Sequence, residues 1–427
     1  MENNKVKIIG LIIVVVVVGA LLVKWLPSLT DPAGSDQAGN LVINFDDPNP
    51  APKAGFEAAV EAFKAAHPNI NVTVNINDRE AHKTAIRNFL SANPPDITAW
   101  YPGNRMAPFV DAGQFEDISG LWSSDRNLSS NFEAIKPTMS RDGKQWGVPY
   151  SYYQWGIYYR ADIFDEHGIS EPETWDELLA ACDTLKANGV TPFTIGTRFL
   201  WTAAGVFDYL NLRTNGYDVH NALTAGEIKY TDPRIRKTFE NWQTMLDRCT
   251  FVENHATMSW QDAIAPFANG DAAMYVMGNF SVAAYKDAGL KEEQIDFFQF
   301  PEITPGLARA EEAPADAFFI PSGAKNKEEA RLFLSFIARP EIQSDWNKTI
   351  GQLPPNSKAS INNDDKFIVE GFETVSTASG LAQFYDRDAP AEMAKAGMEG
   401  FQEFMVNPGR LDAILTRLDG VQERVYK

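Results

Sequence analysis

Aromatic and planar polar side chains recur at positions that follow predicted strands. In this 427-residue sequence, Trp100 with Asn104 and Arg105 follows one predicted strand, and Phe280 follows another. Sugars present apolar C–H faces and a rim of hydroxyl groups, so a sugar site needs flat aromatic surfaces beside amide, carboxylate or guanidinium groups. The pattern therefore indicates a carbohydrate-binding site.

The stretches 150–155 and 384–388 contain the same mixture of residue types. Taken singly, each of these aromatic residues has a position in the core as its simpler explanation. The stretch 150–159 also fits two strands with residues 157–159 buried. The sugar-site hypothesis depends on the recurrence of the pattern at loops.

Motifs for catalysis and cofactor binding are missing from the sequence. The patterns of phosphate-binding loops, dinucleotide-binding turns, serine-hydrolase elbows and zinc proteases do not occur. The five histidines, at positions 67, 82, 167, 220 and 255, form no close pair suited to a metal ion. We therefore expect no catalytic metal, no cofactor and no Ser-His hydrolase.

Strands and helices alternate along the chain. Between residues 70 and 76, apolar residues occupy every second position, which predicts a half-buried strand, whereas Phe56, Val60 and Phe63 recur at helical spacing. The pattern predicts strands at 41–45, 70–76 and 96–100, with helices over residues 56–63 and 79–92 between them. The predicted fold class is α/β with mainly parallel sheets, in which ligands bind at the carboxyl ends of the strands.

The alternation of helices and strands continues over residues 150–310 and predicts a second α/β unit there. Thr174 and Glu177 form a capping box at the start of a helix that Gly189 ends. Further helices are expected at 232–248, at 327–338 and near the C-terminus.

The first 27 residues differ in composition from the rest. An apolar run at 8–23 is flanked by Lys5, Lys7 and Lys24, and sixteen residues span about 24 Å as a helix, less than the ~30 Å hydrocarbon core. A signal peptide and an uncleaved anchor both fit, and the missing small-residue cleavage pattern favours the anchor. We expect an extracytoplasmic protein, with residues 8–26 as a candidate membrane tether and residues 28–40 as a flexible linker.

The charge balance excludes one class of partner. The chain carries 57 Asp and Glu against 38 Lys and Arg, a net charge of -19, without a basic stripe. Nucleic acid is therefore not an expected partner.

The two cysteines, Cys182 and Cys249, fall on buried faces of predicted helices. We expect two separate core thiols, and a disulfide is the alternative because sequence cannot show whether the side chains face each other.

The chain resembles the extracellular solute-binding proteins of carbohydrate ABC transporters, the family that includes maltose- and glucose-binding proteins. Five stretches in the family's order carry the likeness: 56–73, 93–118, 147–178, 267–279 and 317–354. The resemblance implies a non-enzymatic, monomeric receptor that binds a mono- or small oligosaccharide and delivers it to membrane permease subunits. It also implies two lobes with a cleft between them, an N-lobe of 41–149 plus 317–354 and a C-lobe of 150–316 plus 355–427.

The resemblance also implies which residues of this sequence bind the ligand, because they match ligand-binding positions of the family. They are Asp46, Trp100, Asn104, Arg105, Tyr152, Gln154, Trp201, Phe280, Asp316, Arg387 and Asp388. Two departures put the stacking surface and hence the size of the sugar in doubt: Asp46 and Asp47 stand where many relatives have tryptophans, and Phe280 replaces a common tryptophan.

Two other functions remain open. An exported glycoside hydrolase would need two carboxyl groups flanking the scissile bond, and the sequence indicates no such pair. The same fold could also bind a cationic ligand or a peptide, with Asp46, Asp47, Asp316 and Asp388 at the site.

Overall fold

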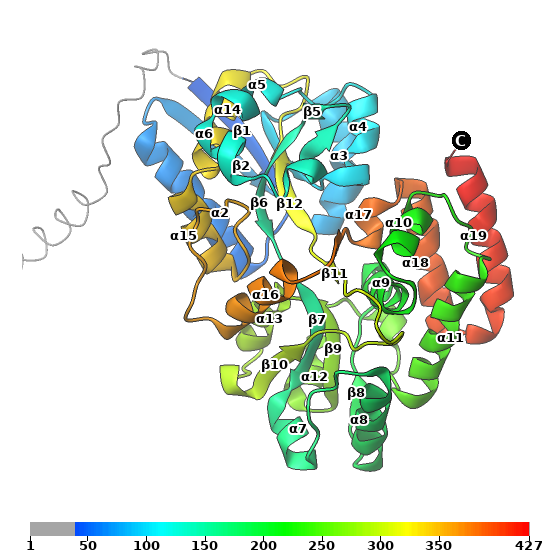
Figure 1. Cartoon of the computed structure of the whole chain (residues 1–427). Coiled ribbons are helices and arrows are strands. Elements are labelled where there is room, and N and C mark those ends of the chain that lie inside the picture. Colours follow the sequence, from blue (N-terminus) through cyan, green and yellow to red (C-terminus); the bar gives the residue numbers. More distant parts are fainter. Residues whose placement is uncertain (1–38, 427) are drawn as a thin grey trace, which may run out of the picture. The chain divides into compact units, whose positions relative to one another are not determined.

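The structure, a computed structural model, describes residues 39–426 (Figure 1). The predicted leader 1–27 and nearly all of the predicted linker 28–40 lie outside the described residues, so those predictions stay predictions. Across the part of the chain that is described, none of the helices is long and apolar enough to cross a membrane.

The first sheet has five strands in the order β2-β1-β3-β12-β6. Strands β1, β2 and β3 are parallel, and β12 runs antiparallel to both β3 and β6. The strands are β1 (Gly39–Phe45), β2 (Ile70–Ile76), β3 (Ile97–Trp100), β6 (Gly147–Tyr152) and β12 (Ala315–Phe319). The predicted β-α-β-α-β order is confirmed, and the central position of β12 shows that a distant part of the chain completes this sheet.

Helices cover both faces of the first sheet. On one face, Phe45 of β1 stacks on Phe56 with ring centroids 4.3 Å apart. On the other face, Trp100 of β3 packs against Phe109. The helices of this region are α2 (Pro50–Ala66), α3 (Arg79–Ala92), α4 (Ala107–Asp111), α5 (Ser119–Ser124), α6 (Arg126–Asn131), α14 (Lys327–Ile337) and α15 (Pro340–Ile350), and a short hairpin joins β4 (Ser140–Arg141) to β5 (Lys144–Gln145).

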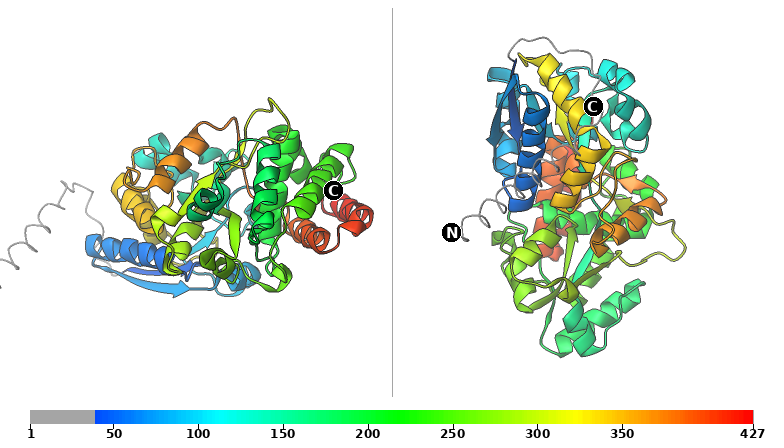
Figure 2. Two further views of the ribbon diagram at one scale, coloured as in Figure 1. Left: turned by 90° about the horizontal axis from the view of Figure 1, so that it is seen from below. Right: turned by 90° about the vertical axis from the view of Figure 1, so that its left-hand side faces the viewer.

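The second sheet has four strands in the order β10-β7-β9-β8. Its strands are β7 (Trp155–Arg160), β8 (Thr191–Phe193), β9 (Ala272–Gly278) and β10 (Ile295–Phe298). The surrounding helices are α7 (Ala161–His167), α8 (Trp175–Ala187), α9 (Trp201–Asn215), α10 (Tyr217–Thr224), α11 (Pro233–Arg248), α12 (Ile264–Asn269), α13 (Ser281–Asp287), α16 (Lys366–Ser376), α17 (Tyr385–Asp388), α18 (Ala391–Val406) and α19 (Leu411–Val425). In the right-hand view of Figure 2, the two sheets occupy the upper and lower halves of the described chain, each with its own helices.

Three segments link the two sheets. Tyr153 and Gln154 join β6 directly to β7. A second link runs through β11 (Glu311–Glu312), which pairs with β13 (Leu381–Ala382), into β12. The third follows α15, where Leu353 bridges to Tyr152. Each sheet has its own large cluster of buried apolar side chains, so the links lie between two cores.

The expectation of two separate thiols is wrong, because Cys182 and Cys249 form a disulfide with Cα atoms 5.0 Å apart. Both residues are fully buried, as their helical spacing predicts. Helix α8 packs against α11, and Cys249 at the end of α11 meets Cys182 there. Periodicity places each cysteine on a buried face but does not say which two faces meet.

We expect the Cys182→Ser, Cys249→Ser double variant to lower the free energy of unfolding by about 2–4 kcal/mol, because the disulfide closes a segment of 67 residues in the unfolded chain. Chemical denaturation of both proteins, each with and without a reductant, measures this difference. The double variant also controls for side effects of the reductant, which should destabilise only the parent protein. Equal stability of the two proteins without reductant would contradict the prediction.

Candidate functional site

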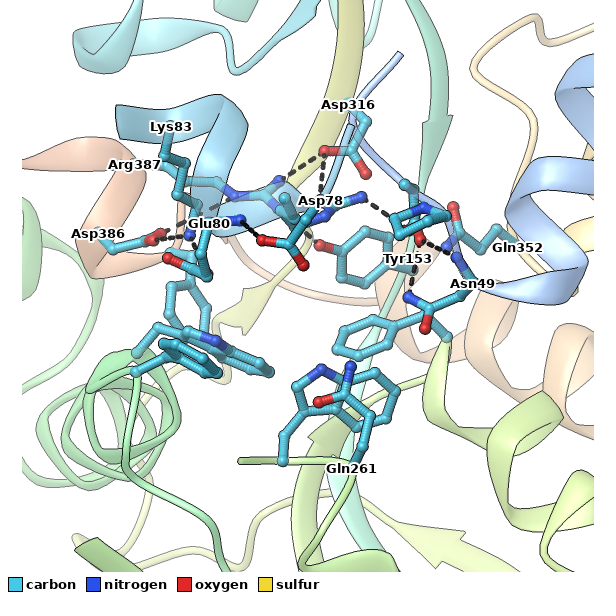
Figure 3. A pocket seen from close by; sticks show the side chains of 18 of the residues that line it. Asn49, Asp78, Glu80, Lys83, Tyr153, Gln261, Asp316, Gln352, Asp386 and Arg387 are labelled. Atoms are coloured by element: carbon cyan, nitrogen blue, oxygen red, sulfur yellow. Dashed lines mark hydrogen bonds and ion pairs between the residues drawn. The ribbon is translucent and has the colours of Figure 1, made fainter. Parts of the chain in front are cut away.

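A cavity of about 870 Å³, part of it open to solvent, lies where the links join the two sheets (Figure 3). Its walls come from the segments that follow β1, β2 and β9, from the links, and from the starts of α9 and α17. The lining residues are Asp47, Pro48, Asn49, Asp78, Arg79, Glu80, Lys83, Tyr153, Trp155, Phe199, Trp201, Trp260, Gln261, Phe280, Asp316, Gln352, Phe384, Asp386 and Arg387. In Figure 3 the labelled charged side chains form a row above a group of aromatic rings.

Arg79 forms the first part of this charged row. It lies in the first turn of α3, which Asp78 caps by accepting from the backbone N–H groups of Glu80 and Ala81. A guanidinium Nη2 of Arg79 donates to Asp47 Oδ2 at 2.9 Å, and Nη1 lies 3.7 Å from Asp316 Oδ1. Arg79 therefore holds together carboxylates from two different segments.

Arg387 forms the second part. Its guanidinium lies 3.2 Å from Asp316 Oδ1, donates to the Tyr153 hydroxyl at 3.0 Å, and stacks 4.1 Å from the centroid of the Tyr101 ring. Lys83 of α3 lies 3.3 Å from Asp386 Oδ2. These contacts leave Arg387 little freedom to move.

The charges in the row set one another's ionisation. Burial opposes the charged form of Asp386, but Lys83, Arg387 and Arg105 outweigh it, and the pKa of Asp386 is lowered. Burial likewise opposes the charge on Arg387, yet the surrounding hydroxyls and carboxylates raise its pKa. Asp386 and Arg387 are therefore both charged at neutral pH.

Five rings form the opposite wall. Trp155 lies 4.7 Å from Phe384 and 6.1 Å from Trp201, centroid to centroid, and Trp260 lies 5.4 Å from Phe280. A Cβ atom added at Gly278 would lie 2.6 Å from the Phe280 ring, so β9 must end in glycine for these rings to pack.

The loop before α9 carries backbone strain. Leu200 has φ +70°, which is rare for a residue with a side chain. Its neighbours Phe199 and Trp201 both line the cavity. Strained backbone of this kind collects at functional sites, where the surrounding structure maintains it.

A family model for bacterial extracellular solute-binding proteins matches residues 47–344. The chain belongs to this family. The solute-binding protein is 29% identical over 318 residues to an ABC transporter extracellular-binding protein of Pyrococcus horikoshii, covering 72% of this chain and 69% of that protein. It is 26% identical over 313 residues to the multiple sugar-binding protein of Streptococcus mutans, covering 71% of this chain and 73% of the relative.

Solved structures of sugar receptors have the same fold as this solute-binding protein. The solute receptor AcbH, described as having an exclusive preference for β-D-galactopyranose, superposes with a TM-score of 0.86 and 26% identity, covering 91% of this chain and 100% of that one. RafE in complex with raffinose superposes with a TM-score of 0.76 and 22% identity, covering 91% and 100% of the two chains. The α/β binding-protein fold expected from the sequence is confirmed.

Four of the predicted ligand-binding residues of the solute-binding protein lie in the cavity wall: Trp201, Phe280, Asp316 and Arg387. Asp46 lies just behind the wall, 2% exposed, with Oδ2 4.0 Å from Arg79 Nε. The pKa of Asp46 is lowered, because Arg79 and its neighbours outweigh the opposing effect of burial. Asp46 therefore belongs to the charged row without facing the cavity.

The structure places Trp100 in the core of the first sheet and not at the cavity. Its side chain is only 3% exposed, and its indole N–H donates to the backbone carbonyl of Arg105 at 3.2 Å. Trp100 ends β3 on the face covered by α3 and α4, so it stacks on protein side chains.

The remaining predicted residues make contacts within the protein outside the cavity lining. Asn104 donates to Asp388 at 3.1 Å, and Asp388 also accepts from Thr224. Arg105 lies 5.9 Å from the Trp100 ring. Gln154 donates to the backbone carbonyl of Phe367 at 3.0 Å, and Tyr152 packs on the small apolar cluster around Leu353.

Sequence reasoning missed most of the charged row. Asp47, which the cationic-ligand alternative named, follows the carboxyl end of β1. The residues that were missed, Asp78, Arg79, Glu80 and Lys83, follow the carboxyl end of β2. Strand ends are where ligands bind in such sheets, so this rule could have found them.

A buried acid pair lies beside the second link. Asp208 of α9 and Glu312 of β11 are both fully buried. Burial raises the pKa of Asp208 to about 7 and also raises the pKa of Glu312. Further carboxylates nearby, Glu311, Asp386 and Asp388, add to the repulsion. His220 Nε2 lies 4.0 Å from Asp208, but burial lowers the pKa of His220 to about 4, so the pair binds a proton in the folded protein.

We expect the Glu312→Gln variant to lose part of the pH dependence of stability. In the unfolded chain Glu312 releases its proton near pH 4.5, but in the folded chain only at a pH well above that value. Glu312 therefore lowers stability as the pH rises above 4.5, by up to about 1.4 kcal/mol per pH unit, and the variant lacks this contribution. Denaturation from pH 5 to pH 8 measures the effect as the difference between parent and variant. If the free energy of unfolding depended on pH with the same slope in both proteins, the prediction would be wrong. Glu423→Gln is the control, because Glu423 forms an exposed ion pair with Lys229.

Proposed function

We propose that this protein is the extracytoplasmic receptor of an ABC importer and encloses a mono- or small oligosaccharide in the cavity between its sheets. The observation that carries the proposal is the pairing of an aromatic wall with a row of carboxylates and guanidinium groups across one cavity. A pyranose ring can place its C–H face on the rings and its hydroxyl groups on the charged row.

The names of the relatives support the same substrate class. The Streptococcus mutans relative is a multiple sugar-binding protein, and the receptor AcbH prefers β-D-galactopyranose. A hexopyranose is therefore the first ligand to test, and oligosaccharides such as raffinose come next because RafE binds one.

We propose an N-lobe of 41–149 plus 317–354 and a C-lobe of 150–316 plus 355–427, hinged at the three links. Ligand contacts on both lobes would favour a closed state, and a permease that recognises this state would accept the loaded receptor. In this proposal the receptor is a monomer without enzymatic activity, held at the outer face of the membrane by residues 8–26.

A thermal-shift screen against neutral hexoses and small oligosaccharides tests the proposal, with calorimetry for each compound that stabilises the protein. We expect at least one sugar to raise the melting temperature and to bind with one site per chain. Incubation with chromogenic glycosides should release no product, because a receptor returns its ligand unchanged. Stabilisation by amino acids, polyamines or peptides, with none by sugars, would favour the alternative ligand classes.

A further inference from the structure

The charged row of the cavity has an excess of negative charge. The cavity wall contains five carboxylates, Asp47, Asp78, Glu80, Asp316 and Asp386. It contains three cations, Arg79, Lys83 and Arg387. Building on the proposed function, we propose that this row makes the receptor select uncharged sugars and reject sugars that carry a carboxylate, the uronic acids.

Each cation of the row already has a carboxylate partner. Arg79 lies 2.9 Å from Asp47, and Arg387 lies 3.2 Å from Asp316. Lys83 has two partners, Glu80 at 3.2 Å and Asp386 at 3.3 Å. An anionic ligand would have to compete with these built-in carboxylates for every cation.

The carboxylates can accept hydrogen bonds from the ligand but cannot donate any. An ionised carboxylate only accepts hydrogen bonds, whereas a sugar hydroxyl both donates and accepts. A hydroxyl can therefore donate to Asp316 or Asp386 while it accepts from a neighbouring guanidinium. A uronate replaces one such hydroxymethyl group with a second acceptor that carries a negative charge.

The surroundings strengthen the repulsion. Tyr153 beside the row, and Trp155 and Phe384 on the opposite wall, are almost fully buried, and apolar surroundings lower the effective dielectric constant between charges. The row crosses the view in Figure 3 from Asp386 to Asp316, above the rings, so a pyranose ring stacked on the rings would lie close to negative charge. The amide of Asn49 near the end of the row already donates to Asp47 at 2.7 Å.

The test compares three forms of one sugar, chosen as the neutral hexopyranose that binds best. Calorimetry on the full chain measures the parent sugar, its uronate, and its uronamide, which has the shape of the uronate without the charge. We expect the uronamide within about tenfold of the parent, and the uronate weaker than the uronamide by about 100-fold or more, since like charges in contact oppose binding. Binding of the uronate within about tenfold of the uronamide would overturn the inference.

A pair of variants separates charge from shape. In Glu80→Gln, Lys83 loses one of its two carboxylates at a side chain that is 31% exposed, so we expect the ratio of uronamide to uronate affinity to fall several-fold. Glu61→Gln removes the same kind of pair, with Lys64, from the surface of α2, and its ratio should match the parent protein. If the ratio of uronamide to uronate affinity did not fall in Glu80→Gln, the charged row would not be the cause of the selection.

Failure of the proposed function gives a different result. If the parent sugar binds and the uronate binds equally well, only the inference on charge is wrong. If a uronate binds and no neutral sugar does, the inference is also overturned, while a sugar receptor remains. If no sugar of any charge binds, both proposals are wrong.

Discussion

Replacing Arg387 with Met is expected to lower the free energy of unfolding by about 3–5 kcal/mol, because Asp316 and Asp386 then keep only Arg79 and Lys83 as partners and stay buried with an excess of negative charge. Arg387 lies between the rings of Tyr101 and Tyr153 and contacts Asp316 and Asp386, both nearly fully buried. Sugar binding should also fall below detection, because the variant removes donors from the cavity wall and frees Asp316 to move.

Urea denaturation without ligand measures the stability change, and calorimetry on the folded variant measures binding. Arg236→Met is the matched control, since Arg236 pairs with Asp412 at 2.7 Å on the surface, where ion pairs contribute less than about 1 kcal/mol. If Arg387→Met were as stable as Arg236→Met and bound sugar normally, the central role of Arg387 would be refuted.

Two tryptophans should respond to truncation in opposite ways. Trp100→Ala should lower the free energy of unfolding by about 3–5 kcal/mol, as for a large side chain removed from a core, while the folded fraction keeps most of its affinity for sugar. Trp201 is half-buried in the cavity wall, so Trp201→Ala should weaken sugar binding by about 1–3 kcal/mol with a smaller loss of stability.

Unfolding stability and sugar affinity are measured for both variants, so each tryptophan is the control for the other. Trp175→Ala adds a half-buried tryptophan that packs on Phe300 and does not line the cavity; its affinity for sugar should equal that of the parent protein. If Trp100→Ala folded but bound sugar as weakly as Trp201→Ala, Trp100 would belong to the binding site, as the family resemblance implies.

Local patterns predicted the elements well. The alternation from Ile70 to Ile76 gives β2, and the predicted helix 79–92 coincides with α3 (Arg79–Ala92). The alternative interpretation of 150–159 as two strands agrees with β6 and β7. These features depend on neighbours a few residues apart, so periodicity contains the information.

The contacts between elements were beyond the reach of the sequence. Trp100 is correctly placed at the end of β3, but the face it occupies depends on α3 and α4 covering that side. Arg387 was found by resemblance, whereas its contact with Asp316 joins segments that only the folded chain brings together. The disulfide was missed for the same reason.

The position of β12 in the middle of the first sheet has a consequence for the order in which the chain can fold. Strand β6 pairs with β12 in that sheet, yet β12 is synthesised about 160 residues later, which takes roughly 8–30 s at 5–20 residues per second. During that interval the edges of β3 and β6 are unpaired and able to join the wrong strand. Substitutions within 315–319 should therefore reduce the yield of correctly folded protein as well as its stability.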